Sequence, residues 1–333
     1  MLTHSIHLLK GLQYPSGLFA ASRLDANTGY HLAWIRDNMY AALGFEAVRQ
    51  FKEVVKTYHA LLDIFKKHEY KIDWMITQPS PKHSWRYIHA RYNPVNGEEI
   101  WEEWGNKQND AIGAFLFKIG DLEAKGIRVI RNLEDLRIVQ KLVNYLAAIE
   151  YWHDADNGMW EEAEDVHASS IGACVAGLKK VQMLVDVAPA LIKKGEDALN
   201  KLLPNETATR DVDLSLLSLI YPYNIVSKEQ RSMILKNVEN MLVRERGVLR
   251  YVDDKYYNNG LGEAEWTMGF CWLAIIYKQL NVPNKYAFYM RKAAEAMTPR
   301  GELPELYYAN TNLHNDNYPL SWAQSLYVVA STI

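Results

Sequence analysis

Hydrophobic residues recur at intervals of three and four along most of this 333-residue chain, and this helical period constrains the fold more than any other feature. Few stretches alternate as a β-strand requires, and the best candidate is the segment 85–92, WRYIHARY. We therefore predict an all-α protein of about twelve helices. The expected helices span 3–12, 38–50, 52–66, 108–122, 134–152, 168–181, 183–202, 212–221, 228–242, 263–279, 284–297 and 319–331.

The connections between these helices are of two kinds. Some are brief and polar, such as LPNETATRD and NVPN, and are typical of simple turns. Others are long and rich in aromatic residues, carboxylates and glycine, which is unusual inside a compact domain and typical of functional loops. The long connections are 14–36, 69–107, 153–167, 245–262 and 299–318. Their recurrence about once per helix pair predicts helical hairpins in a ring, with these loops at one end.

Several bulk properties restrict the class of protein. The net charge is −3 with Lys and Arg scattered along the chain, which argues against a nucleic-acid partner. The longest apolar runs are too short to cross a membrane, which needs roughly 20 residues, and the N-terminus lacks a signal-peptide pattern. Cys174 and Cys271 lie in apolar stretches, as buried free cysteines do. We expect one domain over residues 1–333, in the cytoplasm, with no membrane partner.

Aromatic residues are abundant, with 10 Trp and 21 Tyr, and many lie beside Gly, Asp, Asn or Glu. Sugars bind through C–H faces that stack on aromatic rings and through hydroxyls that pair with carboxylates and amides. This composition therefore suits a carbohydrate cleft, although an aromatic-rich core would produce the same counts.

The first two polar and aromatic clusters directly precede expected helices. The segment YHLAWIRD (30–37) contains Trp34 and places Arg36 beside Asp37. The guanidinium donors of Arg36 and the carboxylate acceptor of Asp37 can together bind two adjacent sugar hydroxyls. The segment WGNKQND (104–110) runs from Trp104 to Asp110. Asp37 and Asp110 can equally be helix caps.

Three further clusters contain carboxylates. In GMWEE (158–162), Trp160 is followed by two glutamates, where an apolar wall and a like charge would raise the pKa of an acid. Two glutamates near the start of a helix are also ordinary surface residues. The fourth cluster joins RYVDDKYY (250–257) to EAEW (263–266), and the fifth is LPELY (303–307), followed by PLSW (319–322). Glu305 in this last loop is a candidate second carboxylate or a solvated residue.

Other chemistries lack their signatures in this sequence. It has no Gly-rich phosphate loop, no GxSxG elbow and no CxxC or HExxH metal spacing. His83 and His89 are dispersed, as structural or surface histidines are. We therefore expect neither a cofactor nor a metal ion.

Taken in order, the five clusters resemble the catalytic domain of family 15 glycoside hydrolases, the glucoamylase and glucodextranase group. The N-terminal region of the phosphorylase kinase alpha and beta subunits is similar too. The resemblance runs from about Leu18 to Trp322. It implies an (α/α)6 toroid of six helical hairpins, without the N-terminal β-sandwich that bacterial and archaeal relatives usually carry.

The resemblance also implies roles for individual residues. Glu161 would be the general acid, Glu305 the general base, and Tyr30 a neighbour of the developing cation. Arg36 and Asp37 would bind the sugar at the non-reducing end, in subsite −1. The other residues that the matched motifs place at the substrate are Trp34, Trp104, Asp110, Trp160, Glu162, Arg250 and Trp266. The chain departs from the family at Asn106, where an Arg is usual.

The function that the resemblance implies is an inverting hydrolase that releases glucose from the non-reducing end of an oligosaccharide or disaccharide α-glucoside. Inversion needs an acid on one side of the glycosidic bond and a base that activates water on the other. Two alternatives remain open at this point: a catalytically silent regulatory toroid like the kinase subunits, and a disaccharide phosphorylase from a neighbouring toroid family. The presence of both carboxylates favours an enzyme.

Overall fold

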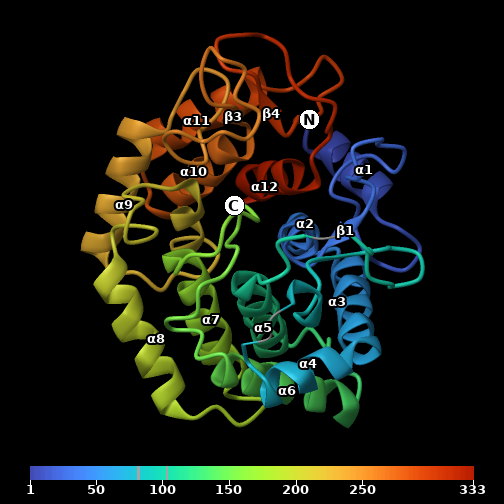
Figure 1. Ribbon diagram of the computed structural model, residues 1–333. Helices are drawn as coiled ribbons and strands as arrows, with labels where there is room; N and C mark the ends of the chain where they lie inside the picture. The colour runs from blue at the N-terminus through green and yellow to red at the C-terminus, as the bar shows by residue number, and fades with distance from the viewer. Residues whose placement is uncertain (81–82, 103) are drawn as a thin grey trace.

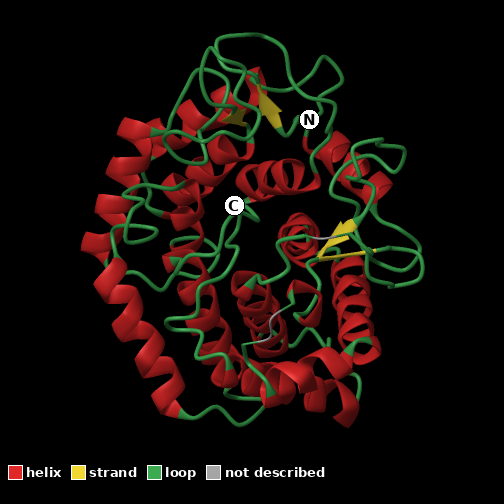
Figure 2. Cartoon of the chain, in the orientation of Figure 1, coloured by secondary structure: helices red, strands yellow, loops and turns green. Residues whose placement is uncertain are grey.

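The computed structural model describes residues 1–80, 83–102 and 104–333, and most of these residues are helical (Figure 2). The α-helices are α1 (Leu2–Leu12), α2 (Ile35–Ala47), α3 (Phe51–Lys67), α4 (Glu69–Thr77), α5 (Asn109–Ala124), α6 (Leu133–Ala148), α7 (Ala168–Val181), α8 (Pro189–Leu202), α9 (Lys228–Met241), α10 (Met268–Gln279), α11 (Pro283–Glu295) and α12 (Ser321–Thr332). Two 3-10 turns, η1 (Ser84–Arg86) and η2 (Leu214–Leu219), complete the helical elements of the described chain.

The helices form two concentric layers around a closed ring (Figure 1). In the inner layer α2 contacts α5, α5 contacts α7, α7 contacts η2, η2 contacts α10, α10 contacts α12, and α12 returns to α2. Each inner element is backed by an outer helix, since α1, α3, α6, α8, α9 and α11 contact α12, α2, α5, α7, η2 and α10 respectively. The predicted all-α toroid is therefore confirmed.

The burial of the two layers follows from their sequences. Inner helices such as α5 and α10 are apolar on almost every side and are buried over most of their length. Outer helices such as α3 and α8 carry a single apolar stripe and leave their remaining faces exposed. The closest inner pair is α5 and α7, where a Cβ on Gly113 would lie 2.4 Å from the backbone of Ala173 and Cys174.

The structure corrects several expected elements. The segment 69–107 contains α4 and η1, and only Arg91–Tyr92 of the expected strand 85–92 is a strand, β2. The helix expected from 183 begins at Pro189, because proline is well suited to a first helical turn. The stretch 212–221 is the 3-10 turn η2 instead of an α-helix, and its start is capped by the side chain of Asp213.

Two small antiparallel ribbons tie the long loops together at one end of the ring. Strand β1 (Ala33–Trp34) pairs with β2, which places Trp34 opposite Arg91. Strand β3 (Glu265–Trp266) pairs with β4 (Leu306–Tyr307), which places Trp266 opposite Leu306. Segments that are far apart in sequence are thereby held side by side.

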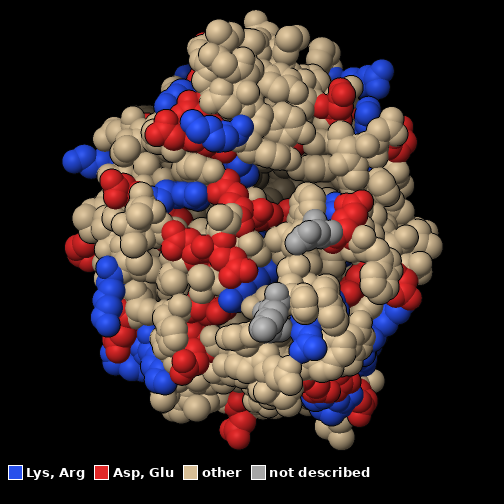
Figure 3. Space-filling view, viewed as in Figure 1, with Lys and Arg blue, Asp and Glu red and all other residues tan. Residues whose placement is uncertain are grey.

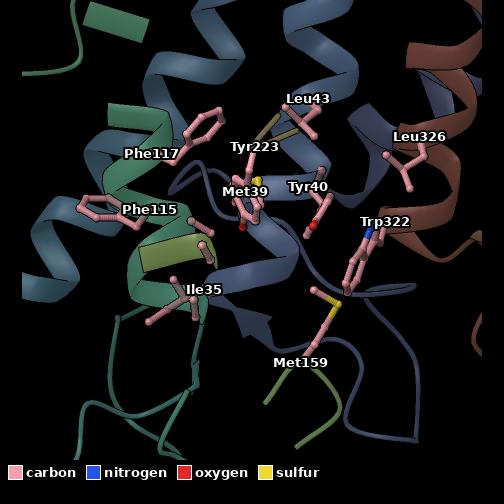
Figure 4. Close-up of a cluster of buried hydrophobic side chains, with 14 of the residues drawn as sticks. Ile35, Met39, Tyr40, Leu43, Phe115, Phe117, Met159, Tyr223, Trp322 and Leu326 are labelled. Carbon is pink, nitrogen blue, oxygen red and sulfur yellow. The ribbon is translucent and has the colours of Figure 1, made fainter. Parts of the chain in front are cut away.

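The core fills the centre of the ring (Figure 4). Met39 and Tyr40 of α2 lie between Phe115 of α5 and Trp322 of α12, and the rings of Tyr40 and Trp322 stack with centroids 4.1 Å apart. These buried side chains form a rigid base beneath the loops. No helix in the described ranges is long and apolar enough to span a membrane.

Candidate active site

A cavity of about 240 Å³ lies among the long loops, above the core. Its lining combines carboxylates, arginines and aromatic rings over an apolar base. The lining residues are Ala21, Tyr30, Trp34, Arg36, Asp37, Trp104, Met159, Trp160, Glu161, Glu162, Arg250, Tyr256, Trp266, Met268, Glu305, Leu320 and Trp322. Asp and Glu side chains also gather around a hollow near the middle of the face seen in Figure 3.

Glu161 borders this cavity from a tight turn between α6 and α7. Its backbone has φ of 61°, a left-handed conformation that is uncommon and strained for a residue with a Cβ. Its carboxylate accepts hydrogen bonds from Trp104 Nε1 at 2.8 Å and from Gln108 Nε2 at 2.9 Å, with an Arg36 nitrogen at 3.5 Å. The side chain is therefore held in one orientation.

Arg36 and Asp37 lie in the first turn of α2 and close another side of the cavity. Arg36 donates to both carboxylate oxygens of Asp110, at 3.2 and 3.0 Å, and to Gln108 Oε1 at 3.0 Å. Burial raises the pKa of Asp37 to about 7; Arg36 opposes this shift, while Glu161 and Glu305 add to it. Asp37 is therefore a buried carboxyl group with a raised pKa in a cavity that also contains Glu161 and Glu305.

Asp110 does not line the cavity. It lies behind Arg36, is 1% exposed, and fixes the guanidinium through the pair of hydrogen bonds. The capping alternative for both aspartates is wrong, because α2 and α5 have Trp34 and Gln108 at their N-caps.

Glu305 lies on another side of the same cavity, immediately before β4. Its Oε1 accepts a hydrogen bond from Tyr30 Oη at 2.6 Å, and its Oε2 accepts from the Asn315 and Asn317 amides at 2.5 and 2.7 Å. Burial raises the pKa of Glu305, and the three hydrogen bonds oppose that shift because they favour the ionised carboxylate.

Glu162 is bound by a separate group of donors. Arg250 lies 3.2 Å from Oε1, Tyr251 donates to the same oxygen at 2.5 Å, and Arg210 donates to Oε2 at 2.9 Å. The neighbouring carboxylates Glu161 and Glu162 therefore face different surroundings. Glu162 lies between two arginines and a tyrosine, whereas Glu161 faces an indole donor, an amide donor and, at 3.5 Å, Arg36.

Aromatic rings form the walls. Arg91 stacks on Trp104 at 3.9 Å from the ring centroid and lies 5.5 Å from that of Trp34, which holds these two walls together. On the opposite side Trp160 lies 6.0 Å from Trp266 and donates its Nε1–H to Asp213 at 2.8 Å. Flat rings around a polar interior are the arrangement that a sugar ring requires.

The structure gathers residues from all five sequence clusters around one cavity. Apart from Asp110, the sequence-predicted site residues all line it: Tyr30, Trp34, Arg36, Asp37, Trp104, Trp160, Glu161, Glu162, Arg250, Trp266 and Glu305. The predicted site omitted Tyr256 and Trp322, which belong to the fourth and fifth clusters, and three buried amides that hold the two glutamates: Gln108, Asn315 and Asn317. The motif WGNKQND contained Gln108, but nothing in the sequence told this amide from the others.

No group of three or more His, Cys, Asp or Glu side chains that could hold a metal ion occurs among the residues that the structure describes.

Asn106, where the family usually has Arg, does not line the cavity and points its Oδ1 toward the backbone N–H of Ala90 at 3.5 Å.

Comparisons with known proteins identify the family and support the fold. The family model described as "Glycosyl hydrolases family 15" matches residues 1–332. The phosphorylase b kinase regulatory subunit alpha, liver isoform, of Mus musculus is 25% identical over 96% of this chain, which spans 31% of that subunit. A glycosidase variant, E335A, in complex with glucose has the same fold, with a TM-score of 0.83 and 20% identity over 99% of this chain and 95% of its own. A bacterial glucoamylase complexed with acarbose has a TM-score of 0.75 and is 18% identical, over 98% of this chain and 54% of its own.

Proposed function

This chain belongs to family 15 of the glycosyl hydrolases, and on that premise we propose that it is an inverting exo-hydrolase of α-glucosides, with Glu161 as general acid and Glu305 as general base. One observation carries the proposal. Two carboxyl groups separated by 144 positions in sequence (305 minus 161) border a single cavity, each with its own set of hydrogen-bond donors.

The acid step requires a proton on Glu161 when the glycosidic oxygen lies beside it. Asp37, Glu161 and Glu305 share the cavity, and a neutral sugar that fills it excludes water from all three. We propose that Glu161 is the carboxyl group that holds the proton when the sugar is bound. Glu161 transfers its proton to the glycosidic oxygen as the bond from that oxygen to C1 breaks.

The base step requires an ionised Glu305. Tyr30, Asn315 and Asn317 all donate to this carboxylate, and their hydrogen bonds favour the charged form against the effect of burial. Glu305 removes a proton from the attacking water while that water bonds to C1 from the face opposite the leaving oxygen. The product then has the inverted anomeric configuration.

The cavity supports exo action at the end of a chain. Arg36 is held by Asp110 and cannot turn away, and Asp37 makes no hydrogen bond to another described side chain, so both can meet the outer hydroxyls of a terminal glucose. Buried apolar side chains such as Met268 and Leu320 line the cavity, and a base formed by them would leave no passage for a continuing chain. Glu162, Arg250 and Trp266 would contact the leaving sugar.

A silent regulatory toroid is the second candidate, favoured by the similarity to the kinase alpha subunit. The hydrogen-bond donors that surround both Glu161 and Glu305 argue against a silent toroid. Phosphorolysis is less well supported, because Asp110 already neutralises Arg36 and the nearby carboxylates would repel phosphate.

The experiment is to incubate the protein with maltose, isomaltose, trehalose and dextrin and to assay free glucose. We expect Glu161→Gln and Glu305→Gln each to lower kcat by about 10³-fold or more, while the exposed-site control Glu150→Gln leaves it unchanged. Proton NMR during turnover should show β-glucose forming first from an α-glucoside. Retention of configuration, or near wild-type turnover by either variant, would refute the assignment; absence of turnover on every α-glucoside would support the silent toroid.

A further inference from the structure

A second hollow, of about 940 Å³, shares no described lining residue with the candidate active site. We call this hollow the aromatic groove. It is lined by Tyr70, Lys71, Trp74, His83, Ser84, Trp85, Tyr87, His89, Glu99, Ile100, Trp101, Glu102, Asn106 and Glu164. The mechanism proposed above uses none of these side chains.

Large aromatic rings at the groove are open to solvent. Trp101 is 98% exposed, Trp85 is 52% exposed and Trp74 is 39% exposed. The rings of Trp74 and Trp85 meet edge to face, with centroids 5.8 Å apart. The ring of His83 stacks on Trp85 and the Arg86 guanidinium lies over both indoles, yet both remain partly exposed. Tryptophan is usually well buried in folded proteins, and a gathering of exposed indoles marks a surface that binds something.

Polar side chains lie beneath these rings. Lys71 is buried and pairs with Glu99 at 2.6 Å. His89 is 3% exposed, and its Nδ1 accepts a hydrogen bond from the backbone N–H of Arg91, which leaves the proton on Nε2. That Nε2 lies near the backbone carbonyl of Ile100 but makes no hydrogen bond of ordinary geometry with any residue that the structure describes. A buried donor that is poorly paired gains when a ligand supplies a better-placed acceptor.

We propose that the aromatic groove is a second carbohydrate site, which holds several glucosyl units of an α-glucan chain. Indole faces match the C–H faces of sugar rings, and sugar hydroxyls can accept from His89 and donate to Glu99 and Glu102. Glu99, Glu102 and Glu164 line the groove and already pair with Lys71, Arg91 and Lys107, so an anionic ligand would have to compete with these carboxylates. A purely apolar partner would remove water from these polar groups without offering them hydrogen bonds.

Residues that line the groove and a residue that lines the catalytic cavity are neighbours in the sequence. Trp104 borders the catalytic cavity, whereas Glu102 and Asn106, two positions away on either side, border the groove. Arg91 links the two sides, because it stacks on Trp104 and forms an ion pair with Glu102. A polysaccharide held in the groove would keep chain ends close to the cavity and raise their effective concentration there.

The choice of α-glucan rests on the proposed function, but binding can be tested without turnover. Native gel electrophoresis through amylopectin, dextran or, as a control, xylan measures retardation directly. We expect α-glucan to retard the wild type, and the double variant Trp85→Ala/Trp101→Ala to bind at least about fivefold more weakly. Because both indoles are largely exposed, their loss should not unfold the chain. Phe288→Ala removes an exposed ring on α11 and serves as the matched control.

The outcomes separate this proposal from the proposed function. If the groove binds α-glucan, the double variant loses retardation and activity on long dextrins but hydrolyses maltose as the wild type does. The wild type could release no glucose and still be retarded by α-glucan, with the retardation lost when Trp85 and Trp101 are replaced. That result would refute the hydrolase assignment and support the groove proposal. Unretarded wild type, or retardation that the double variant retains in full, would overturn the groove proposal.

Discussion

Tyr30 donates a 2.6 Å hydrogen bond to Oε1 of Glu305, a residue 275 positions away in the sequence. This bond joins the loop before β1 to the loop before β4. It also favours the ionised carboxylate, whose pKa burial raises. In the proposed mechanism Tyr30 therefore helps, with Asn315 and Asn317, to keep Glu305 ionised as the base.

Replacement of Tyr30 by Phe removes this donor and keeps the ring. Loss of a hydrogen bond to the charged form raises the pKa of Glu305 further. Because the base must be ionised, the rise of kcat/KM with pH on the acidic side should move to higher pH, and kcat should fall about tenfold. A pH–rate profile checks this, and an unshifted acidic limb would contradict the role of Tyr30.

We expect Asp213 to hold in place the side chains on the side of the cavity where the leaving sugar would bind. It accepts hydrogen bonds from Trp160 Nε1 at 2.8 Å and from Arg210 at 3.0 Å, and Arg210 in turn binds Glu162. Asp213→Asn should lower kcat/KM for maltose about tenfold but leave α-glucosyl fluoride, which lacks a leaving sugar, nearly unaffected. Asp197→Asn, at an exposed position on α8, is the control. Equal losses on both substrates would indicate a purely structural role.

Close packing of α5 against α7 predicts a large effect at Gly113. An added Cβ would lie 2.4 Å from backbone atoms of Ala173 and Cys174, so the helices must separate. Gly113→Ala should lower the free energy of unfolding by about 3 kcal/mol. Gly11→Ala in α1, where no atom lies within 4 Å, should instead raise it by about 0.5–1 kcal/mol. Urea unfolding measures both, and similar values would contradict the packing argument.

The stability of the fold should depend on the charge of His167. Burial favours the neutral ring, but the hydrogen bond and charge of Glu206, with Asp156 and Asp213, outweigh burial and raise the pKa of His167 to about 9. A raised pKa stabilises the folded state below about pH 6.5, the unfolded value, and this contribution disappears as pH rises through about 9.

The free energy of unfolding should therefore fall by about 2–3 kcal/mol between pH 6.5 and 9. Burial also raises the pKa of Asp156 to about 7, and its ionisation adds a decrease in the same direction at lower pH. His167→Gln should flatten the dependence between pH 6.5 and 9. Urea unfolding at several pH values checks this, and an equal slope in the variant would refute it.

Local sequence determined much of the architecture, because helix formation depends on residues three and four positions apart. The expected helix 168–181 has the same bounds as α7. The motif pairs Arg36–Asp37 and Glu161–Glu162 also marked the loops that meet at the cavity, since their chemistry is visible in a few adjacent residues.

Tertiary structure decided what local patterns do not encode. The short ribbons depend on partners such as Trp34 and Arg91, which are distant in sequence. The local pattern of WRYIHARY therefore predicted a longer strand than the one that forms. Asp110 and Asp37 look alike in sequence, yet only Asp37 borders the cavity, because packing of α5 turns Asp110 behind Arg36. The meeting of Glu161 with Glu305 in one cavity has the same origin: closure of the ring brings together loops that no short-range interaction connects.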